Sequence, residues 1–306
     1  MSCASFASPL GASRVAPSRR SRRLLGSSRT VPTAAVSDVR SSSGAELLRR
    51  LDIDAPGWSG GYGTGGKVWS SSAVLCDWLV DNAAGLNLRG ASVAELGSGT
   101  GVVGIACAAL GASRVVLSDG GSKSLLRLAK DNAAKNARAG NIDLDATDVT
   151  VCGYSWGADE VPPEMISAAP FDVVVGSDCT YSVGGHGALC DSINALLACG
   201  RADERDDTRE PVARSNPPVV ILGHQHRTLA AALAGRGSSG WGRDPHLDMF
   251  VRTAARRGLR VEEVETRSLA WHGLRNVSVL RVTPADRERT EQDNRGGDEQ
   301  QVDAPP

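Results

Sequence analysis

The 306-residue sequence has no Cys-x-x-Cys pair and no long apolar run. Its seven cysteines are scattered, which argues against a disulfide framework and favours buried thiols in a reducing compartment. His224 and His226 are the only closely spaced histidines, and no third ligand follows them, so we predict no metal site. Residues 96–113 are uncharged but rich in glycine, which favours a buried loop and helix over a membrane span.

Acidic residues and lysine are missing from residues 1–37, which contain six arginines and nine serines. This composition is typical of an organelle transit peptide, and a disordered basic arm is the alternative. We expect a chloroplast location first, with the mitochondrion or the cytoplasm as alternatives. The net charge of the whole chain is only −1, so nothing predicts binding to nucleic acid.

Strand-like and helix-like segments alternate from residue 70 onward. This alternation predicts an α/β fold, a doubly wound Rossmann-like sheet of seven strands that is mostly parallel with an antiparallel last strand. The expected strands are 91–96, 114–118, 149–152, 171–176, 219–222, 259–264 and 276–282. The expected helices are 70–84, 102–111, 121–138, 186–199 and 246–257.

Composition also divides the chain. We expect a transit peptide over 1–37, a flexible entry segment over 38–66, and one catalytic domain over 67–283. Residues 201–218 are highly charged and carry almost no apolar mass, so we expect a disordered insertion there and a disordered tail over 284–306.

A glycine-rich turn, "AELGSGTGVVG", follows the first expected strand and precedes a helix. Glycines allow positive φ and let a ligand lie against the main chain, and ligands of open α/β sheets bind at this end of the strands. Asp119 ends the next strand, where a carboxylate can accept both hydroxyls of a ribose. NAD and S-adenosylmethionine (SAM) both fit this pattern.

Three features favour SAM. Glu95 precedes the turn, where a negative charge suits a cationic amino group better than a pyrophosphate. Gly97, Gly99 and Gly101 make a longer turn than NAD needs, and no basic residue lies near it in the sequence. An NAD(P) oxidoreductase would also need a catalytic pair such as Tyr-x-x-x-Lys, which none of the three tyrosines forms.

The stretch "ELGSGTGVVGIACAALGASRVVLSD" resembles the first motif of class I, seven-strand, SAM-dependent methyltransferases. Together with "KVWSSSAVLCDWL", "YSWG" and "VVVGSDCTYS", it is similar to the protein-lysine methyltransferases of family sixteen, which carry Asp/Glu-x-x-Tyr after the fourth strand. The likeness covers roughly residues 60–282.

The resemblance implies a role for each matching position. Asp178 and Tyr181 would be the catalytic pair that faces the incoming amine; otherwise Asp178 would cap a helix and Tyr181 would belong to the core. Asn132 and Asn136 would have structural roles. The implied cofactor-binding residues are Trp69, Glu95, Gly97, Ser98, Gly99, Gly101, Asp119, Trp156 and Ser177.

The chain departs from the family at Ser70, where an Asp is usual, and at His224–His226, where an acid often stands. We therefore expect a SAM-dependent N-methyltransferase that modifies a protein side chain, most often lysine. The alternatives are a methyltransferase that acts on a small molecule and a non-catalytic SAM-binding protein. We expect a folded protein as the partner, no membrane, and a monomer.

Overall fold

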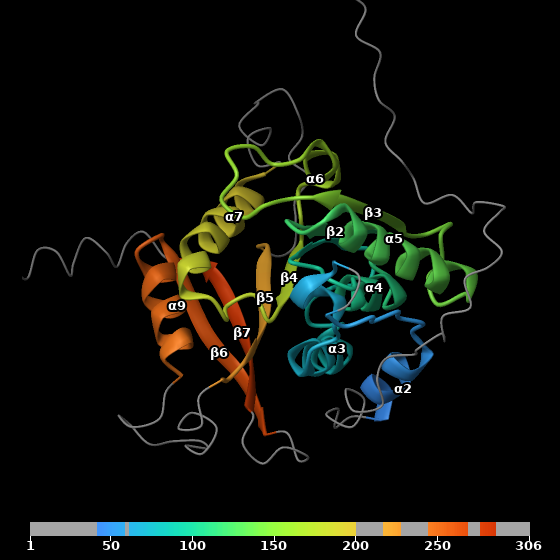
Figure 1. Cartoon of the computed structure of the whole chain (residues 1–306), viewed down its shortest axis with the longest axis horizontal. Coiled ribbons are helices and arrows are strands. Elements are labelled where there is room, and N and C mark those ends of the chain that lie inside the picture. Colours follow the sequence, from blue (N-terminus) through green and yellow to red (C-terminus); the bar gives the residue numbers. More distant parts are fainter. Residues whose placement is uncertain (1–41, 59–60, 200–216, 228–243, 269–275, 286–306) are drawn as a thin grey trace, which may run out of the picture.

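The computed structural model describes residues 42–58, 61–199, 217–227, 244–268 and 276–285. One seven-stranded sheet runs through them in the order β3-β2-β1-β4-β5-β7-β6 (Figure 1). The strands are β1 (Ser92–Leu96), β2 (Arg114–Asp119), β3 (Asp148–Gly153), β4 (Val173–Ser177), β5 (Val219–Gln225), β6 (Leu259–Ser268) and β7 (Asn276–Pro284).

Strands β1 to β5 are mutually parallel, and β7 runs antiparallel between β5 and β6. This confirms the predicted doubly wound α/β fold and its antiparallel last strand. The strand order reverses between β1 and β4. The carboxyl ends of β1, β2, β4 and β5 therefore meet at one edge of the sheet around a switch point, which is where such sheets bind ligands.

Helices cover both faces of the sheet. One layer contains α2 (Ser42–Arg50), α3 (Ser70–Asn82), α4 (Val102–Ala109) and α5 (Lys123–Arg138), and the other contains α6 (Pro163–Ala168), α7 (His186–Ala198) and α9 (Pro245–Ala255). Two short 3₁₀ turns, η1 (Gly63–Gly66) and η2 (Val183–Gly185), flank the carboxyl edge of the sheet. The predicted helices agree with α3, α4, α5, α7 and α9 to within a few residues.

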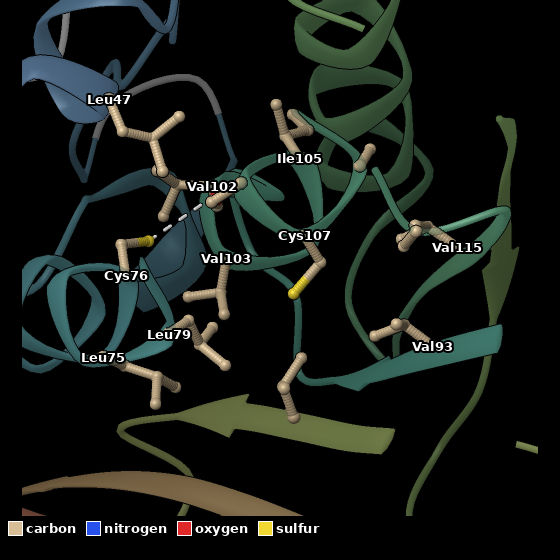
Figure 2. Packing of buried hydrophobic residues seen from close by; sticks show 14 of the residues in the cluster. Leu47, Leu75, Cys76, Leu79, Val93, Val102, Val103, Ile105, Cys107 and Val115 are labelled. Carbon is tan, nitrogen blue, oxygen red and sulfur yellow. Dashed lines mark hydrogen bonds between the residues drawn. The ribbon is translucent and has the colours of Figure 1, made fainter. Parts of the chain in front are cut away.

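The apolar faces of α3 and α4 meet over the sheet. Leu75 and Leu79 of α3 pack beside Val103 of α4, and the Cys76 thiol points toward the Val102 carbonyl at 3.9 Å (Figure 2). Each fully buried leucine of this kind contributes about 1.5–3 kcal/mol relative to an exposed one. Because α4 begins directly after the glycine turn, this packing fixes the position of the turn.

The entry segment is more structured than we predicted. Residues 42–50 form α2, and Leu48, Leu51 and Ile53 are fully buried. Two buried asparagines of α5 hold the chain that follows, because Asn136 accepts from the N–H of Asp52 and Asn132 accepts from that of Asp54. The prediction of a flexible segment over 38–66 is therefore wrong for residues 42–58 and 61–66. Composition missed this because the anchoring residues lie about eighty positions away.

The structure does not describe residues 1–37, 201–216 or 286–306, so the predicted transit peptide, insertion and tail lie almost wholly outside it. Pro284, which we placed in the tail, ends β7. The six cysteines in the described residues are all free thiols. Among the helices described, none combines the length and apolar character needed to cross a bilayer.

Candidate active site

The glycine turn joins β1 to α4 with three glycines in the left-handed region: φ is 66° at Gly97, 53° at Gly99 and 81° at Gly101. A Cβ atom on Gly97 would lie 2.9 Å from the Trp156 ring, and one on Gly99 would lie 2.8 Å from the Gly65 carbonyl oxygen. Any side chain at these two positions would therefore be strained and would also clash with neighbouring atoms.

Asp119 holds this turn in place from the end of β2. Its Oδ2 accepts from the N–H of Gly99 at 2.9 Å, and its Oδ1 accepts from the N–H of Gly121 at 2.7 Å. The Ser98 N–H donates to the Ser118 carbonyl at 2.9 Å, which binds the turn to the same strand. The carboxylate is therefore fixed at the carboxyl edge with its remaining lone pairs beside the cavity.

A cavity of about 710 Å³ lies over this edge of the sheet. Nine of the eleven predicted site residues line it: Trp69, Gly97, Ser98, Gly99, Asp119, Trp156, Ser177, Asp178 and Tyr181. The structure thus brings together residues that span more than a hundred positions of sequence. Such a volume falls in the range of sites for small ligands and cofactors.

Glu95 and Gly101 do not line the cavity. Glu95 is 1 % exposed, and its Oε2 accepts from the N–H of Gly104 in α4 at 2.9 Å. Burial raises the pKa of this carboxyl to about 8, although the Gly104 N–H partly opposes the shift. Gly101 is the N-cap of α4. The structure therefore differs from the prediction of direct cofactor contacts for these two residues. Both instead hold the start of α4, which follows the glycine turn.

Asp178 leaves the end of β4 with an unusual backbone. It is one of two non-glycine residues with positive φ in the described part of the chain, at 55°. Strain of this kind persists only where the surrounding structure holds it, and it is common at functional sites. The N–H of Asp178 donates to the Gly223 carbonyl at 2.7 Å, so the next strand of the sheet holds the bend.

The Asp178 carboxylate is 7 % exposed and pairs with the Arg227 guanidinium. That guanidinium also lies over the rings of Trp69 and Tyr181, at 5.5 and 5.4 Å from their centroids. Burial raises the pKa of Asp178, and the neighbouring Arg227 and His224 lower it in part. A carboxylate and two aromatic faces therefore surround one cation at the edge of the cavity.

The cavity mouth carries a second group of aromatic and basic side chains. The Trp58 and Trp69 rings meet edge to face at 6.3 Å, and the Lys67 ammonium lies 5.5 and 4.9 Å from their centroids. Trp58 is 62 % exposed, which is unusual for a tryptophan beside a cavity. This mouth therefore offers apolar area to a molecule that approaches from solvent.

Ser177 and Cys179, on either side of Asp178, form hydrogen bonds within the protein. The Ser177 hydroxyl lies 2.6 Å from that of Ser72, which ties β4 to the first turn of α3. The Cys179 thiol donates to the Leu96 carbonyl at 3.2 Å, and burial raises its pKa well above the usual value. Cys179 therefore stays protonated and is a poor nucleophile.

Sequence reasoning missed Gly65, Lys67 and Arg227 as cavity residues. Gly65 offered a signal, because it belongs to a run of glycines just before the Trp69 motif. Arg227 offered only its place five residues after an expected strand. The reach of its side chain across to Asp178 depends on how β4 and β5 pair, which the sequence does not specify.

The cavity fits SAM in several respects. Gly97 and Gly99 leave bare backbone along one wall, and Trp156 offers an aromatic face beside it. The Ser98 hydroxyl and the Tyr154 phenol are buried at the cavity wall and have no hydrogen-bond partner among the described residues. Buried polar atoms of this kind need partners, and a polar ligand can supply them. The two basic side chains of the cavity lining, Lys67 and Arg227, both lie over the Trp69 ring.

Comparisons with known proteins agree with this geometry. The model of a family described as lysine methyltransferase matches residues 51–201. The protein N-terminal and lysine N-methyltransferase EFM7 of Yarrowia lipolytica is 32 % identical over 162 residues, covering 49 % of this chain and 57 % of that protein. The protein-lysine N-methyltransferase EFM6 of Saccharomyces cerevisiae is 29 % identical over 210 residues, covering 62 % and 74 %.

The calmodulin-lysine N-methyltransferase of Arabidopsis thaliana is 30 % identical over 182 residues, covering 59 % of this chain and 54 % of that protein. The chain spans about half the length of most of the curated relatives that it matches.

Proposed function

We propose that the chain is a class I SAM-dependent methyltransferase that methylates a side-chain amine of a folded protein, with lysine as the acceptor. Asp178 orients the amine, Tyr181 forms a wall of the acceptor site, and the glycine turn with Asp119 holds the cofactor. Three of the relatives are named as lysine N-methyltransferases, which supports this choice of acceptor.

One observation carries the proposal: the acceptor end of the cavity already holds a cation. Arg227 occupies the space between Trp69 and Tyr181 and pairs with Asp178. A lysine ammonium has the same charge and is attracted by the same groups, a carboxylate and two aromatic faces. The guanidinium of the chain itself therefore marks where the amine of the substrate binds.

Methyl transfer requires the protein mainly to orient the acceptor amine toward the methyl group. SAM supplies a methyl group on a sulfonium, which an amine takes by in-line displacement. A lysine amine has a pKa of about 10.4 in water and must lose a proton before its lone pair can attack. Removal from water favours the neutral form, and Asp178 can accept an N–H bond that points the lone pair along the line of attack.

The open mouth supports a large acceptor. Trp58 and Tyr181 are exposed by 62 % and 42 % beside the cavity, so a protein surface can cover both while one side chain enters. A metabolite methyltransferase gains more from a closed site that surrounds its substrate. We propose that the partner is a protein rather than nucleic acid or membrane, that the chain acts as a monomer, and that residues 1–37 direct it to the chloroplast.

The test uses tritiated SAM, a chloroplast lysate and the Asp178→Asn variant. We expect a labelled protein band with the parent chain and at least a hundredfold less label with the variant. Calorimetry should show SAM binding within about threefold of the parent. The matched control is Asp191→Asn, which removes an exposed carboxylate of α7 that pairs with Arg257.

The outcomes separate the alternatives. Label in the small-molecule fraction alone would favour the metabolite methyltransferase. SAM binding without any labelled product would favour a non-catalytic binding protein. Full labelling by Asp178→Asn would remove the role proposed for that carboxylate.

A further inference from the structure

A second cluster of functional side chains lies next to the cavity but does not line it. His224 lies near the end of β5, His226 directly follows that strand, and Asp244 is the N-cap of α9. His224 Nε2 lies 3.2 Å from Asp244 Oδ2, and His226 Nδ1 lies 3.7 Å from the same oxygen. One ligand atom from each residue falls within 4.8 Å of the other two, and all three residues are buried.

The far nitrogen of each imidazole is already engaged. His224 Nδ1 lies 2.6 Å from the Thr180 hydroxyl, and His226 Nε2 lies 2.7 Å from the Ser278 hydroxyl. When these nitrogens carry the protons and donate to the hydroxyls, the lone pairs of the other two nitrogens point toward Asp244. Metal-binding histidines are oriented in this way, by an outer hydrogen bond that fixes ring and tautomer.

Hydrogen bonds within the cluster do not give every buried polar atom a partner. His224 can donate to Asp244 if its proton moves to Nε2, but His226 Nδ1 has no hydrogen-bond partner among the described residues. His226 is only 9 % exposed, so water does not readily replace the missing partner. One cation bound by the two imidazoles and the carboxylate would satisfy all three groups at once.

The spacing of the three groups suits a small divalent ion. Zinc binds nitrogen and carboxylate oxygen at about 2.0–2.2 Å, so two ligands at a tetrahedral angle lie about 3.3 Å apart. The two separations from Asp244 Oδ2, 3.2 and 3.7 Å, fall close to this value, and the ligand atoms of all three residues lie within 4.8 Å of one another. The two nitrogens and one oxygen form a ligand set that zinc and other first-row transition metals accept.

We propose that His224, His226 and Asp244 bind a divalent transition-metal ion, with zinc as the ion, and that this site holds the acceptor side of the cavity in shape. Asp244 Oδ2 accepts from the backbone N–H of Arg227 at 3.1 Å. Thr180, whose hydroxyl contacts His224, is a near neighbour of Asp178 and Tyr181 in the sequence. The metal therefore connects β5 and α9 to the residues around the acceptor amine. The expectation of no metal site considered only residues close in sequence, and Asp244 is distant.

The first experiment measures metal in the full-length chain, purified without a histidine tag. We expect about one zinc per chain by elemental mass spectrometry. Removal by a chelator should lower the unfolding temperature by about 5 °C or more, because an ion that binds only the folded chain stabilises it. Cobalt(II) added to the stripped chain should give visible absorption bands of low-symmetry coordination at one equivalent.

The variants are His226→Asn and Asp244→Asn, and the matched control is His186→Asn. His186 is also a buried histidine with an unpartnered Nδ1, but it lies outside the three-residue cluster. We expect the first two to lose the metal and the control to keep it. Cobalt titration of the parent chain decides the question even if a variant fails to fold.

A stripped parent chain that gives no cobalt bands, with metal below 0.1 equivalent as purified and no change of unfolding temperature with added zinc, would overturn the site. The cluster would then be a hydrogen-bonded network only. Iron or nickel at one equivalent would keep the site and overturn the assignment of zinc. Loss of metal from all three variants alike would overturn the proposed ligand set.

Discussion

Arg227 donates from Nη2 to Oδ2 of Asp178, so the carboxylate assigned to the acceptor amine is paired with a cation of its own chain. The contact neutralises a carboxylate that burial would otherwise leave costly to ionise. It also means that an incoming amine and Arg227 compete for the same oxygen. The resting site is therefore stable, and the substrate must displace the guanidinium.

Arg227→Ala should lower the KM for the protein acceptor several-fold at pH 9, because the amine no longer displaces a guanidinium. Loss of the cation also removes a group that lowers the pKa of Asp178, so that pKa should rise further. The acidic limb of the kcat/KM profile should then move to higher pH. Steady-state kinetics across pH 6–9.5 measure both effects.

Arg227→Lys is the matched control, since it keeps a cation beside Asp178. We expect its pH profile to stay near that of the parent. A higher KM for Arg227→Ala, together with an unmoved acidic limb, would show that Arg227 helps to bind the acceptor and does not compete with it.

Asp119→Ala should weaken SAM binding by about 10- to 100-fold, which corresponds to the loss of charged hydrogen bonds worth about 1.5–3 kcal/mol. The carboxylate both faces the cavity and holds the N–H groups of Gly99 and Gly121. Calorimetric titration with SAM measures the dissociation constant, and Asp145→Ala, an exposed change far from the cavity, is the control. An unaltered constant for Asp119→Ala would remove its assignment to the cofactor.

The positions of the strands and helices along the chain were predictable because their signals are local. The β-branched run before Asp178 and the glycines after Glu95 lie within single elements, and the alternation of strand and helix follows from them. The side chains at the carboxyl edge could be placed from the same pattern, because parallel strands end together. This accounts for the agreement on Asp119, Ser177 and Asp178.

The remaining features depend on contacts between distant segments. Asn132 binds the backbone of Asp54, and Asp244 lies beside His224 and His226 at the end of β5. No local pattern marks such partners, so composition alone predicted a flexible entry segment and did not bring Asp244 together with the two histidines. Glu95 shows the opposite limit. Its place near the end of β1 was predicted correctly, but only the structure shows that its carboxylate accepts from the N–H of Gly104 and does not line the cavity.

Glu95→Gln should make the protein more stable at pH 8 than the parent, with little difference at pH 4.5. Burial raises the pKa of Glu95 to about 8, whereas an unfolded glutamate titrates near about 4.3. The raised pKa contributes stability that is complete below the unfolded value and is lost as pH rises through about 8. The loss is about 1.4 kcal/mol per pH unit at its steepest.

Glutamine does not titrate and can still accept from Gly104, so the variant should not show this loss. Denaturant unfolding at pH 5, 6, 7 and 8 measures the difference, with Asp148→Asn as an exposed control. A constant difference across this range would show that Glu95 is already ionised in the folded chain at pH 5.

Asn132→Ala should destabilise the protein by about 2–3 kcal/mol and should also weaken SAM binding. Its amide accepts from the Asp54 N–H and donates to the Asp54 and Thr100 carbonyls, at 2.8, 3.1 and 2.9 Å. Truncation leaves these groups without partners in a site where Asn132 itself is fully buried. Denaturant unfolding measures the stability and calorimetry the binding.

The effect on binding has a structural reason. The segment after Asp54 leads to Gly65, whose carbonyl oxygen would lie only 2.8 Å from a Cβ on Gly99, so the anchored segment covers the glycine turn. Asn194→Ala is the control, because it removes a single partly buried bond from α7 to the Arg257 carbonyl and should cost about 1 kcal/mol without changing SAM affinity. Equal losses in the two variants would mean that the asparagine anchor does not set the position of the cofactor wall.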